Sequence, residues 1–187
     1  MNTFLRVSCF GLWLCLCFAQ LSSGAHLQTP SGNYQQTIQI NHNLDKDVIT
    51  ARLVPFRIAE DIDRYHRVDL SAAFTHSYKT KQTQPQVEVE LFTIVKARKL
   101  NTDLYVVFVV DGKEVHFGSN RSAVRNPVPG RRWTGERMVF SVPVEDFQQL
   151  AAAEKLAIKM GGVRFDLNDD SRLSLKLFAE KVKQIAH

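Results

Sequence analysis

The side chains most suited to binding a ligand are the arginines that gather between residues 118 and 136. This segment has no acidic residue before Glu136. Its candidate ligand-binding residues are Arg121, Arg125, Arg131, Arg132 and Trp133. A guanidinium group presents a planar fork that matches phosphate, sulfate or carboxylate. A neighbouring indole can stack on a sugar ring or anchor a protein partner. The pattern therefore predicts a site for an anionic ligand.

The same segment also fits a structural interpretation. It is long, and its sequence shows no strand pattern, which is typical of a loop that is either functional or disordered. A run of charge is often only a solvated surface. In that case Trp133 would be tucked into the core as the next strand begins. Both interpretations stay open at the level of sequence.

The histidines suggest a second kind of chemistry. The chain contains six of them: His26, His42, His66, His76, His116 and His187. Zinc sites use such side chains when the fold brings several together, but scattered histidines usually make ordinary surface contacts. Ser77 follows His76 directly, and Asp69 is near, but a catalytic triad is assembled in space, so adjacency carries no weight. We therefore predict no metal and no cofactor.

Carboxylates gather in two short clusters, around residues 60–63 and 166–170. Paired carboxylates can bind calcium or transfer protons. The first cluster is more simply a solvated loop, and Asp169 and Asp170 suit the start of a helix. The chain has no glycine-rich phosphate loop, no nucleophile elbow and no paired zinc-protease histidines. We predict a non-catalytic binding module. A hydrolase using carboxylates and a histidine is one alternative, and a structural protein that pairs through a strand edge is another.

The first 25 residues have the pattern of a secretory signal peptide. Arg6 precedes an apolar run over residues 7–19, and Ser23-Gly24-Ala25 offers a small-residue cleavage site. The 13-residue run is shorter than the roughly 20 residues of a spanning helix. Cleavage is expected after Ala25 or one residue earlier. Removing 25 of the 187 residues leaves 162. That mature chain would be secreted or periplasmic and free of cysteine, because all three cysteines precede residue 25.

Composition sets further limits on partners. The whole chain carries a formal charge of +5, and losing Arg6 with the signal peptide leaves an excess of +4. Such a mild excess does not point to nucleic acid. The expected partners are an anionic glycan, a lipid headgroup or an acidic protein surface, with no transmembrane segment after cleavage. Asn120-Arg121-Ser122 would be a glycosylation acceptor in a eukaryote.

The elements that must position these side chains are mostly strands. Residues 26–36 are polar and read as a flexible lead-in, and residues 37–187 read as one β-rich domain. The expected strands are 37–40, 48–58, 67–78, 86–98, 104–110, a return strand through 115–117, 137–142, 156–160 and 163–167. Asp111-Gly112 and Gly161-Gly162 predict tight turns. Pro55 favours a sheet edge or a bulge.

Two helices complete the pattern. Residues 144–153 have helical spacing, and a last helix is capped within residues 168–170 and carries an apolar stripe from Leu175 to Ile185. The alternating strand at 86–98 has apolar Phe92 and Ile94 on its outward set, which predicts cover on both faces there. We expect a mainly β, antiparallel β-sandwich-like domain of eight or nine strands, with the C-terminal helix packed on it.

Overall fold

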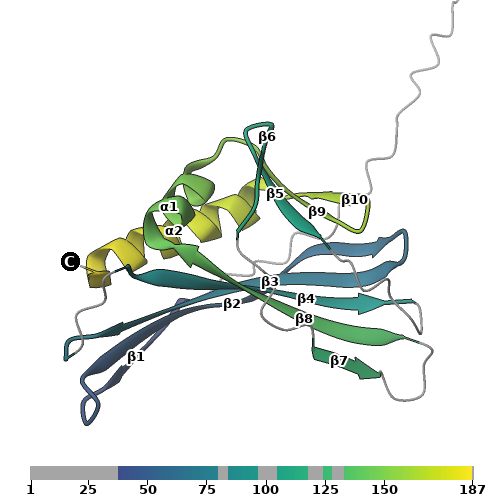
Figure 1. Cartoon of the computed structure of the whole chain (residues 1–187). Coiled ribbons are helices and arrows are strands. Elements are labelled where there is room, and N and C mark those ends of the chain that lie inside the picture. The colour runs from purple at the N-terminus through teal and green to yellow at the C-terminus, as the bar shows by residue number, and fades with distance from the viewer. Residues whose placement is uncertain (1–37, 80–83, 97–104, 118–123, 128–132, 187) are drawn as a thin grey trace, which may run out of the picture. The chain divides into compact units, whose positions relative to one another are not determined.

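A computed structural model describes residues 38–79, 84–96, 105–117, 124–127 and 133–186, with the backbone alone for residues 124–127. The expected signal peptide and lead-in lie outside the described residues, as do Arg121, Arg131 and Arg132. The described residues form ten strands and two helices. The arrangement is mostly antiparallel β with a C-terminal helix (Figure 1), so the expected fold class is confirmed.

The larger sheet has six strands in the order β1-β2-β3-β4-β8-β7, and every neighbouring pair is antiparallel. Its members are β1 (Ile38–Asn43), β2 (Val48–Ile62), β3 (Tyr65–Ser77), β4 (Gln86–Val95), β7 (Val124–Pro127) and β8 (Thr134–Pro143). The registers Tyr65↔Val95 and Val95↔Thr134 bring the start of β3, the end of β4 and the start of β8 together at one end of the sheet.

The smaller sheet has four strands in the order β10-β9-β5-β6. They are β5 (Val106–Val110), β6 (Lys113–Val115), β9 (Leu156–Met160) and β10 (Val163–Asp166). Asp111 and Gly112 join β5 to β6 with φ values of 49° and 85°, and Gly161 and Gly162 join β9 to β10 at 54° and 84°. Two consecutive positive φ values give the turn whose twist matches a hairpin, so both predicted turns are confirmed.

The helices are α1 (Val144–Ala152) and α2 (Asp169–Ala186). The α1 helix continues directly from β8, and the Val144 N–H donates to the Pro85 carbonyl at 3.1 Å. At the start of α2, the Asn168 side chain accepts from the Ser171 N–H at 2.8 Å. Asn168 therefore caps the helix as the sequence predicted, satisfying a backbone donor that has no partner within the helix.

One continuous core joins these layers. Val87, Val89 and Leu91 of β4 alternate with exposed or half-exposed residues, so one face of the larger sheet is apolar. Helix α2 packs on β2 and β3, whereas α1 packs on β4 and β8 (Figure 1). The smaller sheet meets the same core through an edge-to-face contact of Phe108 with Phe140, whose ring centroids are 5.9 Å apart.

Three local expectations need correction or refinement. The segment 118–136 was expected to have no strand of its own, but β7 lies within it and pairs with β8, so that expectation is wrong. Among the described residues β1 pairs with β2 only as far as Leu53, so Pro55 lies where that side of β2 has no strand partner, as expected of a local edge. The register between β2 and β3 also shifts between Leu53 and Phe56, which confirms the bulge. Phe92 and Ile94 are half-buried on the outer face, so the cover there is partial.

Removing the contact between the two helices should strongly destabilise the domain. Phe147 and Phe178 are fully buried, with ring centroids 5.8 Å apart in an edge-to-face arrangement. We expect Phe178→Ala to lower the free energy of unfolding in urea by about 3–5 kcal/mol, the usual cost of deleting a buried ring. The matched control is Leu177→Ala, because Leu177 is 48% exposed on the same helix; it should cost less than about 1 kcal/mol. Equal effects would contradict this packing.

Candidate ligand-binding site

Trp133 is held by a histidine at one end of the larger sheet. It directly precedes β8, is half-buried, and its ring contacts that of His66 of β3 in a tilted arrangement, with centroids 4.4 Å apart and planes inclined by 39°. The two residues are far apart in sequence but meet because β3, β4 and β8 are neighbours. Trp133 is therefore neither a free loop side chain nor part of the deep core. Its indole is held against the sheet by the contact with His66.

An ion-pair cluster positions the histidine. Asp61, near the end of β2, lies 2.8 Å from Nδ1 of His66 and 2.7 Å from Nζ of Lys96. Asp61 has φ 50°, a conformation that aspartate tolerates better than most residues. The Lys96 hydrogen bond, helped by that of His66, lowers the pKa of Asp61 from 3.8 to about 2. We call Asp61, His66, Lys96 and Trp133 the Trp133 cluster.

A second set of contacts joins this end to the smaller sheet. Tyr65 is fully buried, and its hydroxyl donates to the Met160 carbonyl at 3.2 Å. Its ring meets Phe165 edge to face at 5.2 Å. The Arg64 guanidinium donates to the Gly161 carbonyl and lies over the Tyr65 ring. Burial raises the pKa of the Tyr65 hydroxyl, while the charge of Arg64 opposes that rise. Hydrogen bonds from Tyr65 and Arg64 therefore hold the β2–β3 turn against the β9–β10 hairpin.

The cations described near this cluster already have protein partners. Lys96 forms an ion pair with Asp61, and the Arg64 guanidinium donates a hydrogen bond to the Gly161 carbonyl. On the outer face, Arg67 Nε donates to the buried Asp69 carboxylate at 2.5 Å. A pair of opposite charges contributes little net field to an incoming anion. Positive charge for a ligand would therefore have to come from the arginines that follow Phe117 in sequence.

Of the predicted site residues, the structure places Trp133 fully and Arg125 by its backbone. Arg125 lies in β7, opposite Glu136 of β8 in the antiparallel register. Glu136 is fully buried and contributes to the raised pKa of Tyr65. The remaining arginines lie outside the described residues, but the chain order fixes Arg132 immediately before Trp133. The structure thus brings Trp133 to His66, which the sequence did not predict as its partner.

The other chemical candidates are dispersed over the fold. His76 of β3 has Phe74 and Tyr78 as ring neighbours, and His42 also contacts Tyr78. His116 follows β6 in the smaller sheet, where its charge contributes weakly to the lowered pKa of Glu114, a carboxylate paired mainly with Lys159. Within the described ranges, no three histidine, cysteine or carboxylate side chains are grouped as a metal site.

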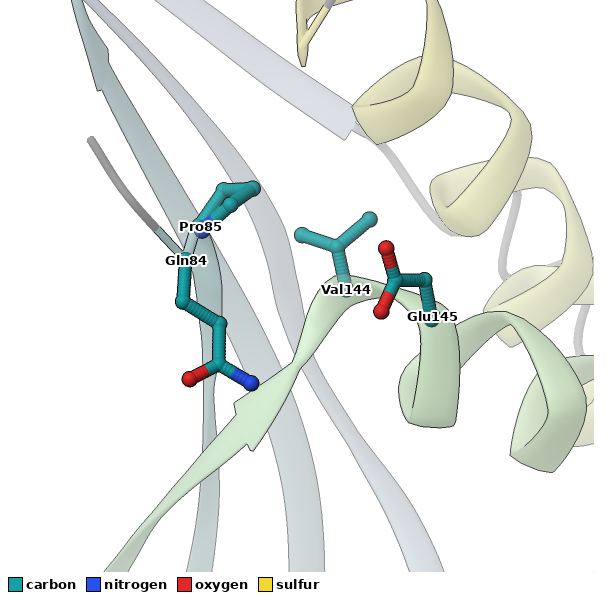
Figure 2. A pocket seen from close by; sticks show the side chains of 4 residues that line it. All are labelled: Gln84, Pro85, Val144 and Glu145. Atoms are coloured by element: carbon teal, nitrogen blue, oxygen red, sulfur yellow. The ribbon is translucent and has the colours of Figure 1, made fainter. Parts of the chain in front are cut away.

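A shallow depression lies at the opposite end of β4 and β8. It has a volume of about 410 Å³ and is lined by Gln84, Pro85, Val144 and Glu145 (Figure 2). The carboxylate of Glu145 lies in the first turn of α1, where it complements the positive end of the helix dipole. That carboxylate would repel an anion. The depression is therefore a poorer match for the expected ligand than the Trp133 cluster.

Comparison of the chain with family models, curated proteins and solved structures gives no match. In the part of the chain that is described, neither helix combines the length and the apolar character that crossing a membrane requires. The site must therefore be interpreted from its own geometry.

Sequence reasoning missed most of the Trp133 cluster. The sequence predicts a solvated loop for the acidic stretch at residues 60–63, but its first three residues extend β2, and Asp61 orients His66. For His66, the sequence suggests only a metal-ligand role. The useful signal was the strand pattern itself: once β3, β4 and β8 are placed side by side, their adjoining ends bring these residues together.

The ion pair of Asp61 gives a testable titration. Since its folded-state pKa is lowered, the carboxylate stabilises the fold above its ordinary pKa of 3.8, and this contribution is lost as the pH falls towards about 2. We expect NMR titration of the Asp61 carboxyl to give a midpoint near 2 and Lys96→Gln to move it up towards 3.8. The control is Lys113→Gln in the other sheet, which should leave it unchanged. A wild-type midpoint near 4 would contradict the pairing.

Proposed function

We propose that this protein is an exported, non-catalytic binding module that recognises an anionic ligand at the Trp133 cluster. The proposal rests on the contact between the rings of Trp133 and His66, which are tilted by 39° and have centroids 4.4 Å apart. This contact fixes an indole on the sheet immediately after Arg131 and Arg132 in the chain. An aromatic platform beside guanidinium groups combines stacking with charge-assisted hydrogen bonding.

The charge distribution supports the choice of an anion. Lys96 and Arg67 are each paired with a carboxylate, so the described residues of this end contribute little excess positive charge. The segment from Gly118 to Arg132 adds four arginines and no carboxylate. In the sequence, the excess positive charge is therefore concentrated in the stretch that leads into Trp133.

The chemistry favours an anionic glycan among the three expected ligand classes. A sugar ring offers a flat apolar face that stacks on an indole, and its sulfate or phosphate groups suit a bidentate guanidinium. A lipid headgroup would use the arginines without needing the indole. An acidic protein surface would use both, but over a larger area than one tryptophan provides.

A second candidate function rests on the pairing of Asp61 with His66. A carboxylate bonded to Nδ1 of a histidine orients the ring and leaves Nε2 for proton transfer, as in hydrolases that use a histidine base. The hydrolase alternative therefore centres on His66 and not on His76 or His116. It differs from the binding proposal in requiring a product, so turnover of the bound glycan would favour it.

Retention on polyanion columns tests the binding proposal. The protein, expressed as the whole chain, is applied to sulfated-polysaccharide and phosphorylated-cellulose columns and eluted with salt. We expect Arg131→Ala/Arg132→Ala to elute at clearly lower salt, because each lost charge-assisted bond weakens binding by on the order of tenfold. Trp133→Phe should weaken retention on both columns, because both matrices present sugar rings to the indole, but not on a sulfonated polymethacrylate resin, which has none.

The matched control is Arg52→Ala/Lys176→Ala. Both side chains are exposed, one on β2 and one on α2, and the double variant changes the net charge by the same amount. It should elute close to the wild type. Equal elution of the two double variants would show a non-specific charge effect and would overturn the proposed site.

A further inference from the structure

We propose that two copies of this chain pair through their β1 strands, forming one continuous sheet across a two-fold axis. Strand β1 is an outermost strand of the six-stranded sheet, and no other strand among the described residues pairs with its far side. An outermost strand presents a row of backbone N–H and C=O groups that can pair with another chain. The inference is independent of the proposed anion site.

The sequence of β1 lacks the features that usually prevent such pairing. Natural edge strands are protected by charge, proline, bulges or short length. The six residues of β1, Ile-Gln-Ile-Asn-His-Asn, include no proline, glycine, lysine or carboxylate. Their register with β2 is unbroken from Ile38↔Leu53 to Asn43↔Val48. All of them except Ile38 are exposed.

The other described sheet edges carry such protection, and the stretch of β2 beyond its pairing with β1 contains Pro55, Arg57 and Glu60. Strand β7 has four residues and ends at Pro127. Strand β6 has three residues, two of which are Lys113 and Glu114. Strand β10 has four residues and carries the ion pair of Arg164 with Asp166 at 2.8 Å. Strand β1 is thus the longest of the four and the one without charge or proline, which singles it out as the pairing edge.

The partner is a second copy because β1 is complementary to itself. In an antiparallel pair centred on Ile40, Ile40 faces Ile40 of the other copy, Gln39 faces Asn41, and Ile38 faces His42. Opposite residues in such a pair project from the same face. The register therefore brings the two Ile40 side chains together and matches amide with amide; it sets Ile38 against His42 and opposes no like charges. Ile40 is 49% exposed, so pairing would cover apolar surface that β1 leaves open to water.

The location of β1 limits the assembly to a dimer. A two-fold pairing uses β1 of both copies and leaves only the protected edges outside, so it closes and does not continue into a fibre. The register with β2 places β1 beside the first half of that strand, whereas Asp61 lies at its far end. The Trp133 cluster therefore stays accessible in the dimer. A single six-residue strand pair is a small interface, so association should depend on concentration.

Sedimentation velocity over about 1 µM to 1 mM, the range in which a small interface associates, tests the pairing. We expect the wild-type chain to shift from monomer to dimer, and Ile40→Lys and Ile40→Glu to stay monomeric alone. An equimolar mixture of the two variants should dimerise again, because a lysine then faces a glutamate. A wild type that stays monomeric, or a mixture that stays monomeric, would overturn the proposal.

Two controls separate this result from general effects. Leu173→Lys places the same charge at an apolar side chain that is 54% exposed on α2 and should dimerise like the wild type. Loss of the dimer in Leu173→Lys but not in Ile40→Lys would place the contact on α2 and contradict the inference. Arg131→Ala/Arg132→Ala should also dimerise normally, whatever happens to its ligand binding.

Amide hydrogen exchange of the wild type tests the β1 pairing even if the Ile40 variants fail to fold. Protection within residues 38–43 should increase at high protein concentration, while the interior strand β4 should not change. Equal exchange of β1 at low and high concentration would also overturn the inference.

Discussion

The structure depends on covering the single apolar face of the six-stranded sheet. Strands such as β4 alternate buried and exposed residues, so the sheet cannot be stable unless other elements cover its buried side. Two helices pack over β2, β3, β4 and β8, and the smaller sheet packs against β2, β3 and β8. The α1 helix follows β8 without a loop, so the chain passes directly from a strand of the sheet into a helix that covers it (Figure 1).

The position of these covering elements also explains where side chains can meet a ligand. The junction of the two sheets is closed by Tyr65 and Arg64, which bond to carbonyls of the β9–β10 hairpin. Directly beside this closed junction, β2, β3, β4 and β8 end or begin together. His66 and Trp133 meet there because the strand ends are adjacent. A rigid junction next to a half-buried aromatic pair is a suitable support for a binding site.

The sequence predicted those elements whose signals are local. Alternation, the Asp111-Gly112 turn and the Asn168 cap each depend on a few neighbouring residues, and all are found in the structure. Strand β7 was missed because four residues with a proline give no period, and pairing with β8 decides their conformation. The contact of His66 with Trp133 could not be predicted, because it depends on the spatial order of strands that are distant in sequence.

The most direct test of the binding account is the fluorescence of Trp133 during titration with a sulfated oligosaccharide. The chain has two tryptophans, Trp13 and Trp133, so the signal is assigned with the variant Trp133→Phe. We expect a saturable change in emission that weakens with added salt and disappears in both Trp133→Phe and Arg131→Ala/Arg132→Ala. Emission that stays constant up to about 1 mM ligand at low salt would contradict it.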